Sequence, residues 1–289
     1  MQKLTYTNTR GQKIVLQNSA PFILSKLEGT GGVETTLQTT KAPGQDGSTL
    51  HGVSLENRVI NIEGYIFGII REDMYKKRMQ LAGILNPKLG AGTLTYQNDH
   101  STKVISAIAE ESPIFSDRYS NYQKFSLTLI CPQPLWLEEK ESKEEIAYWI
   151  GNLEFDLEIP EDGMELSYRE SNIISNIYNR GDTECGMRIE FTAMASVENP
   201  LLLNINTLEY IKVKQTLIAG DKLIINTAFG NKRVELTRSG VTTNVFNYID
   251  LDSTFLQLAP GDNILKYDAE TGIDNLDVTI YYRPQYVGV

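Results

Sequence analysis

The chain has 289 residues, of which 41% are hydrophobic, 22% are charged and 9% are aromatic, and its formal net charge is −10. This composition is that of an ordinary globular protein and excludes collagen-like and disordered chains. The length predicts about two domains, at roughly 150 residues each. No apolar run approaches the ~20 residues of a transmembrane helix, and the first residues lack a secretory signal. We expect a chain that is made in a cytoplasm and does not span a membrane.

Short runs of β-forming residues with period-two alternation predict strands in the first half of the chain. These predicted strands are residues 13–16, 58–66, 93–96 and 124–129. One segment differs, because between residues 72 and 85 the apolar positions recur at helical spacing: Tyr75, Met79, Ala82 and Leu85. Asp73 near its start and Asn86-Pro87 after its end are suitable start and stop signals. We predict a single helix there.

Residues 29–52 follow neither pattern. They are rich in Gly and Thr, contain Pro43-Gly44 and Asp46-Gly47, and have too few apolar residues to build a core. We expect them to project from the body of the protein as an arm, since segments of this length are more often functional or partner-bound than idle. The alternative is a disordered surface loop.

The second half predicts almost only strands and turns. The short β runs are residues 204–206, 211–214, 222–226, 233–236 and 277–282. Turns rich in Gly, Asp and Asn separate them, and this spacing is typical of a β-sandwich.

Charge also divides the chain. Residues 1–137 hold 14 Lys+Arg and 11 Asp+Glu, whereas residues 138–289 hold 13 and 26, so the formal charges are +3 and −13. The change from a nearly neutral to an acidic sequence occurs at the charged run 138–145. This run directly follows Pro132 and Pro134, which stiffen the chain. We therefore predict two domains, 1–137 and 138–289, the alternative being a solvated loop inside one large domain. The acidic half is not expected to bind nucleic acid, because its field would repel phosphates.

The chain contains few residues and motifs of the kinds that usually act in catalysis. Its two histidines are His51 and His100, and HExxH, GxSxG, P-loop and GxGxxG motifs do not occur. Cys131 and Cys185 match no metal-ligand spacing, and we expect both to be free thiols. The sequence therefore predicts a protein that is not an enzyme, with no catalytic residues, no cofactor and no metal.

Three kinds of site stay open at this point. The acidic pairs Asp250 with Asp252 and Glu161 with Asp162 fit a glycosidase only formally, because acids in turn-rich contexts are usually solvated. Residues 250–252 are also only a fragment of a calcium loop. Sugar stacking needs an exposed ring, and burial in the core is the expected state of the aromatic residues in the acidic half. The candidates for such a ring are Trp149, the sole Trp of this half, with Tyr267, Tyr281, Tyr282 and Tyr286.

Several short segments occur in an informative order along nearly the whole chain. In the first half they are residues 9–11, 21–24, 41–47, 58–64, 86–94 and 132–136. In the second half they are residues 204–210, 220–221, 225–227, 258–263 and 281–284. Together they resemble the distal tail proteins, called Dit, of long non-contractile-tailed bacteriophages.

The resemblance implies a mainly β protein with two β-sandwich domains. The N-terminal domain would form a ring and carry one helix and an extended arm, and the C-terminal domain would be a galectin-like jelly roll. The implied role is that of a structural hub in the virion, at the phage tail tip or baseplate. A homo-hexameric ring would join the tail tube to the tail-associated tip protein and pass the genome through its lumen without specific binding. Receptor-binding proteins are further implied partners, and no membrane is involved.

Galectin-type sugar sites combine His, Arg and Trp, whereas residues 150–289 contain neither His nor Trp. We therefore do not expect that site here, and a host-saccharide binding module of the adhesion device stays as the alternative function.

The composition of the arm fits a ring for an independent reason. A closed ring is a heterologous assembly, so an arm that lies on the next subunit would bury surface that a lone subunit leaves wet. The apolar residues of the arm would anchor it and its glycines would permit the turns. The predicted interface residues are Val33, Leu37, Pro43, Gly44, Asp46, Gly47 and Leu50.

Overall fold

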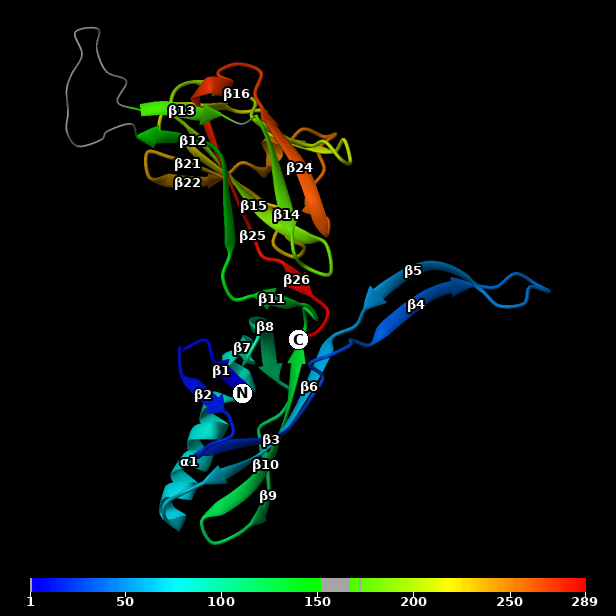
Figure 1. Cartoon of the computed structure of the whole chain (residues 1–289), viewed down its shortest axis with the longest axis vertical. Coiled ribbons are helices and arrows are strands. Elements are labelled where there is room, and N and C mark those ends of the chain that lie inside the picture. The colour runs from blue at the N-terminus through cyan, green and yellow to red at the C-terminus, as the bar shows by residue number, and fades with distance from the viewer. Residues whose placement is uncertain (1, 152–166, 172) are drawn as a thin grey trace. The chain divides into compact units, whose positions relative to one another are not determined.

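The computed structural model describes the backbone of residues 2–151, 167–171 and 173–289, and the side chains of residues 2–146 and 173–289. The chain divides into two compact units, one of residues 1–139 with 285–289 and the other of residues 140–284 (Figure 1). The last five residues thus belong to the first unit. The division into domains 1–137 and 138–289 stays a prediction. Within the described ranges, no helix is long and apolar enough to cross a membrane.

The first unit is built from one large sheet, one α-helix and a separate hairpin. Its strand order is β2-β1-β7-β8-β10-β6-β3, with β9 beside β10 and with β11 joining β8 to the C-terminal β26. The elements are β1 Lys3–Thr7, β2 Lys13–Leu16, β3 Phe22–Glu28, β4 Thr35–Thr40, β5 Thr49–Leu55, β6 Arg58–Phe67, α1 Arg71–Ile84, the 3-10 turn η1 Pro87–Leu89, β7 Gly92–Gln97, β8 Thr102–Ala109, β9 Ile114–Arg118, β10 Tyr122–Cys131, β11 Trp136–Glu138 and β26 Gln285–Tyr286.

The large sheet curls until its two ends meet. Between β2 and β3, the N–H of Leu24 donates to the carbonyl of Gln17 (2.9 Å), and the N–H of Gln17 donates to the carbonyl of Phe22 (3.2 Å). Alternate residues of each strand therefore face one enclosed core, as in β6, where Ile60, Ile62 and Ile66 are buried. Burial of this alternating apolar set is the main force that closes the sheet.

Helix α1 lies where the sequence predicts a helix, but it buries a different face. The buried side chains are Met74, Leu81, Ile84 and the following Leu85, whereas Met79 is 74% exposed. Of the four apolar positions whose spacing predicts the helix, Leu85 is buried, Tyr75 and Ala82 are half-buried and Met79 lies in solvent. Between Met74 and Leu81 the core-facing position is taken by Arg78, whose guanidinium covers the Phe115 ring at 4.3 Å. Because Arg78 is charged, the sequence does not show that its position belongs to the same face of the helix as Met74 and Leu81.

The second unit is a sandwich of two sheets around one core. The larger sheet has the order β13-β12-β25-β15-β20-β21-β22 with β23 beside β15, and the smaller has the order β14-β24-β17-β18, while β16 pairs with β19. The elements are β12 Ser142–Gly151, β13 Ser167–Ser171, β14 Ile174–Asn179, β15 Cys185–Ala193, β16 Val197–Glu198, β17 Leu201–Asn204, β18 Tyr210–Lys212, β19 Thr216–Leu217, β20 Lys222–Asn226, β21 Arg233–Arg238, β22 Val241–Asn244, the 3-10 turn η2 Phe246–Tyr248, β23 Gln257–Leu258, β24 Gly261–Asp268, the 3-10 turn η3 Ile273–Asn275 and β25 Leu276–Tyr282.

The mainly β fold with one α-helix is confirmed in the described residues. Strands β2 and β20 have the predicted bounds, and β6, β7, β10, β21 and β25 contain the predicted runs. The predicted strand 204–206 is wrong beyond its first residue. β17 ends at Asn204, because the Asn204 side chain accepts a hydrogen bond from the N–H of Asn206 (2.9 Å) and turns the chain.

One buried carboxylate holds a turn of the second unit. Asp221 is 1% exposed, and its carboxylate accepts hydrogen bonds from Nε of Arg238 (3.0 Å) and from the N–H of Ile218 (2.9 Å). Hydrogen bonding from Arg238 favours the charged carboxylate and so lowers the pKa of Asp221. The interaction ties the turn before β20 to the end of β21.

Replacing Asp221 by Asn should therefore destabilise the second unit in a pH-dependent way. We expect Asp221→Asn to lower the free energy of unfolding by about 2 kcal/mol at pH 7. A depressed native pKa gives stability above the unfolded pKa of ~3.9, and that stability is lost as the pH falls through the native pKa. The difference between variant and wild type should thus shrink below about pH 4 in urea titrations.

A matched control is Asp268→Asn, which removes an exposed ion pair with Lys266 (3.2 Å) and should change stability little. Equal stabilities of Asp221→Asn and wild type at neutral pH would contradict the role given to the Asp221–Arg238 pair.

Candidate functional site: an exposed hairpin arm

The predicted arm is a β-hairpin of the first unit. Strands β4 and β5 pair antiparallel with each other, and they form a two-stranded sheet that includes no other strand. In Figure 1 the hairpin extends away from the other strands of its unit. Every side chain of β4 is exposed, and so are those of β5 except at Gly52. The alternative of a disordered loop is therefore replaced by a regular hairpin.

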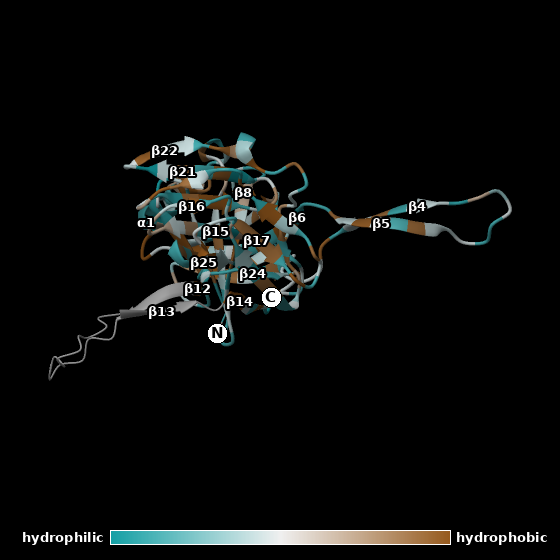
Figure 2. Cartoon of the chain, turned by 90° about the horizontal axis from the view of Figure 1, so that it is seen from above, coloured by the Kyte–Doolittle hydropathy of each residue, from teal (hydrophilic) through white to brown (hydrophobic). Residues whose placement is uncertain are grey.

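The register of the hairpin sorts its residues onto two different faces. Leu37 pairs with Val53, Thr35 pairs with Leu55, and a bulge after Gln38 brings Leu50 opposite Thr39. Because cross-strand partners lie on the same face of a sheet, the four aliphatic side chains share one face. Their exposed fractions are 59% for Leu37, 56% for Leu50, 57% for Val53 and 38% for Leu55. Figure 2 shows hydrophobic segments along β5.

The opposite face of the hairpin is polar. Thr36 donates a hydrogen bond to Glu56 (2.6 Å), and the side chain of Gln38 lies beside Gly52. The hydroxyl of Thr40 and Nε2 of His51 are 2.6 Å apart. One aliphatic face and one polar face are typical of an element whose aliphatic face packs on another surface while its polar face stays in water.

The loop between the two strands contains the predicted turn residues. Pro43 and Gly44 form a turn and Asp46 and Gly47 form a bend, and both glycines have positive φ, +79° and +78°. A side chain at either glycine would strain the backbone. Val33 lies before β4 and is half-buried.

A buried arginine anchors the base of the hairpin. Arg58, the first residue of β6, is 2% exposed and donates to backbone carbonyls of three separate segments. The acceptors are Gly29 (2.6 Å), Gly31 (2.8 Å), Pro134 (2.7 Å) and Val287 (2.5 Å). Its guanidinium also lies 5.7 Å from the centre of the Trp136 ring. Burial lowers the pKa of Arg58, yet a guanidinium stays charged at neutral pH.

Gly29 has a steric reason to be glycine. Its φ is +89°, and a Cβ there would lie 2.0 Å from the carbonyl oxygen of Val59. The chain can therefore leave β3 toward the hairpin close to β6 only without a side chain. Next to Gly29, the N–H of Val289 donates to the carbonyl of Thr30 (3.1 Å). The C-terminal residue therefore also contacts the base of the hairpin.

Sequence reasoning missed Val53, Leu55 and Arg58 as parts of this site. The predicted arm ended at residue 52, although the alternation of Leu50, Val53 and Leu55 across a bulge was a signal in the sequence. Arg58 gave no such signal, because its partners lie 27 to 229 positions away along the chain.

The remaining candidate residues that the structure describes lie in separate elements. His51 lies in β5 and His100 lies in the turn between β7 and β8. Asp250 forms an ion pair with Lys214 (3.3 Å), and Glu161 and Asp162 are outside the described residues. Within the described ranges no group of His, Cys, Asp and Glu could hold a metal ion.

The thiols and aromatic residues have structural positions. Cys131 and Cys185 are free and buried, and burial raises their pKa values to about 11 and about 12. Tyr267 and Tyr282 are buried in the core of the second unit, as expected. Tyr281 lies under the guanidinium of Arg188, and Tyr286 under the ammonium of Lys103. The side chain of Trp149 is outside the described residues.

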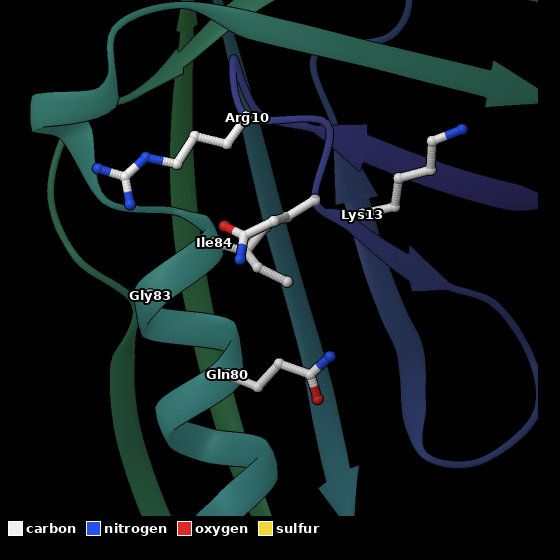
Figure 3. Close-up of a pocket in the computed structure, with 6 residues that line it drawn as sticks. Arg10, Lys13, Gln80, Gly83 and Ile84 are labelled. Carbon is white, nitrogen blue, oxygen red and sulfur yellow. The ribbon is translucent and has the colours of Figure 1, made fainter.

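A cavity of about 400 Å³ opens beside the C-terminal end of α1 (Figure 3). Its lining residues are Arg10, Gln12, Lys13, Gln80, Gly83 and Ile84. Helix α1 has no basic residue in its last turn, so Arg10 and Lys13 supply the positive charge that favours a helix C-terminus. Their charges are thus explained by the fold.

Comparison with known proteins identifies the family. The model of the phage tail protein RIFT-related domain matches residues 9–131, and the model of the siphovirus-type tail component, C-terminal domain, matches residues 180–286. The chain belongs to the Dit family of phage tail components. It is therefore related to structural proteins of the virion tail.

Solved structures share the fold of this Dit-family chain at low sequence identity. The crystal structure of the Dit protein of phage SPP1 is 15% identical, covers 99% of both chains and superposes with a TM-score of 0.70. A chain of the baseplate of phage P2, in its activated conformation with Ca, is 13% identical, covers 100% of this chain and 99% of that chain, and has a TM-score of 0.57. No curated protein matches the sequence significantly.

The Arg58 anchor of this Dit-family protein can be tested directly. Arg58→Met keeps an unbranched apolar side chain but removes the hydrogen bonds of a buried guanidinium to four partly buried carbonyls, so we expect a loss of about 3 kcal/mol in the free energy of unfolding. Hydrogen exchange at the N–H of Val289 should become faster, because the base of the arm loosens. Arg283→Met, at an exposed arginine of the second unit, is the control and should match wild type. Unchanged exchange in Arg58→Met would show that other contacts hold the arm.

Proposed function

We propose that this protein is the structural hub of a bacteriophage tail tip or baseplate. Six copies close into a ring that joins the tail tube to the tail-associated tip protein, and the genome passes through the lumen. The hairpin of each copy lies on the next copy. The observation that carries this proposal is the exposed aliphatic face of the β4–β5 hairpin, which no other strand covers in the part of the chain that the structure describes.

The hairpin supports the proposal on energetic grounds. A two-stranded hairpin is at best marginally stable alone in water and needs packing on a further surface. Leu37, Leu50, Val53 and Leu55 each keep much of their apolar surface in water, and covering each would stabilise by about 1 kcal/mol. A second copy of the chain is a partner that is present in every preparation, and repetition of one heterologous contact closes a ring.

The charge distribution also supports this arrangement. Residues 1–137 have a formal charge of only +3, so copies of the first half can approach one another without strong repulsion. Residues 138–289 carry −13, which favours solubility and keeps this half away from nucleic acid.

Solved structures with this fold suggest the partners. The SPP1 protein is described as a hub of the adsorption apparatus of phages that infect Gram-positive bacteria, and the P2 chain comes from a baseplate. By analogy the partners of this chain are itself, a tail tube protein, a tip protein and receptor-binding proteins. The proposed location is the tail tip of the virion, after synthesis in the host cytoplasm.

A charge on the aliphatic face of the hairpin should prevent ring formation. In Leu37→Glu the new carboxylate would be buried against the neighbouring copy without a partner, which costs several kcal/mol per contact. Purified wild-type protein should form rings in native mass spectrometry and negative-stain images, and Leu37→Glu should stay monomeric with an unchanged thermal midpoint.

Gln38→Glu is the matched control, since it places the same charge one residue away on the polar face, and it should form rings as wild type does. Rings of Leu37→Glu, or a wild-type protein that stays monomeric at high concentration, would contradict the proposal that the hairpin holds the ring.

A further inference from the structure

A second feature of the first unit lies on the outer face of its sheet. A cavity of about 300 Å³ opens over β6, β9 and β10, and its volume is at the lower end of the range of ligand pockets. Its lining residues are Tyr65, Phe67, Asp117, Tyr119, Tyr122 and Lys124. Neither the hairpin nor the core uses these side chains, so their grouping needs a separate explanation.

Three of the aromatic rings form a continuous stack. Phe67 and Tyr122 are cross-strand partners whose rings lie 5.2 Å apart, and Tyr122 stacks on Tyr119 at 4.4 Å. Both interplanar angles are 16°. Tyr119 ends the stack and is 54% exposed, so one face of its ring is open to a ligand. Tyr65 meets the edge of the stack at 6.2 Å.

A β-bulge aims a carboxylate into the same cavity. The register of β9 against β10 shifts between Gln123 and Lys124, which leaves Asp117 as the extra residue of β9. Asp117 has a φ of +27°, an unfavourable conformation for a residue with a side chain. Bulges re-aim side chains, and backbone strain of this kind persists where the surrounding structure requires it. Within the described residues no hydrogen bond engages the Asp117 carboxylate, which interacts electrostatically with the nearby Lys124 ammonium.

Further polar groups surround the rings. No hydrogen bond within the described residues engages the phenol groups of Tyr65, Tyr119 and Tyr122. Lys124 forms an ion pair with Glu63 (2.7 Å), which compensates its charge. The cavity therefore combines aromatic walls with hydroxyl groups and one carboxylate that no hydrogen bond of the described residues engages.

We propose that this cavity binds a saccharide. A pyranose ring presents weakly positive C–H groups on its faces, which match the negative face of an aromatic ring such as that of Tyr119. Its hydroxyl groups can donate to the Asp117 carboxylate and both donate to and accept from the phenols. A phosphate would be repelled by the Asp117 carboxylate.

The binding is tested by saturation-transfer NMR on the full-length protein. Glucose, galactose, rhamnose and N-acetylglucosamine are the probes, each at millimolar concentration. We expect saturation transfer to at least one of them on irradiation of aromatic protons. Tyr119→Ala should weaken the binding about tenfold, which corresponds to loss of one stacking contact. Asp117→Asn keeps the shape of the side chain and should weaken the same signal.

The control variant is Tyr248→Ala, which removes a tyrosine of similar exposure from the second unit and should bind as wild type does. Circular dichroism and ring formation of Tyr119→Ala should also match wild type. Absence of transfer to all four sugars, or equal binding by Tyr119→Ala, would overturn the proposal. Loss of rings in Tyr119→Ala with the fold intact would overturn it too, because the cavity would then face another copy of the chain.

Discussion

The first unit depends on one buried guanidinium. Arg58 is at the point where the hairpin joins the curled sheet, and it is the common donor to the hairpin base, to the segment before β11 and to the C-terminal residues. Each of these segments offers at least one partly buried backbone carbonyl, and a hydrogen bond from a charged donor to such a group contributes about 1.5–3 kcal/mol. A guanidinium is suited to this task because it has five donors and no acceptor. The position of the arm is thus coupled to the closing of the unit by its own C-terminus.

This anchor explains how a hairpin that is exposed on both faces keeps a defined direction. Within the described residues its two strands pair only with each other, so their orientation is set by the base. There Gly29 approaches Val59 and Arg58 binds the carbonyls of Gly29 and Gly31. An arm with a defined direction loses less conformational entropy on binding than a free loop of the same length. The aliphatic face can therefore give its full contribution to a contact with a neighbouring copy.

Local patterns in the sequence predict the elements, and contacts between distant residues decide the site. The helix and strands such as β20 follow from periodicity, and the Gly- and Thr-rich composition of residues 29–52 indicates an arm. The buried face of α1 does not follow from the apolar spacing alone, because Arg78 takes a core-facing position through its contact with Phe115. The anchor could not be predicted, since Arg58 and Val287 are 229 positions apart and the acceptor is a backbone carbonyl of any residue type.

Strand β6 connects the two candidate surfaces of the first unit. It begins at Arg58, which holds the arm, and near its end Tyr65 and Phe67 line the aromatic cavity. At about 3.3 Å per residue these positions are roughly 20–30 Å apart along a strand that is paired on both sides. A strand with this support does not bend readily, so the arm and the cavity are held apart at a fixed spacing. Contact of the arm with a neighbour and occupation of the cavity by a small ligand are then compatible in the same molecule.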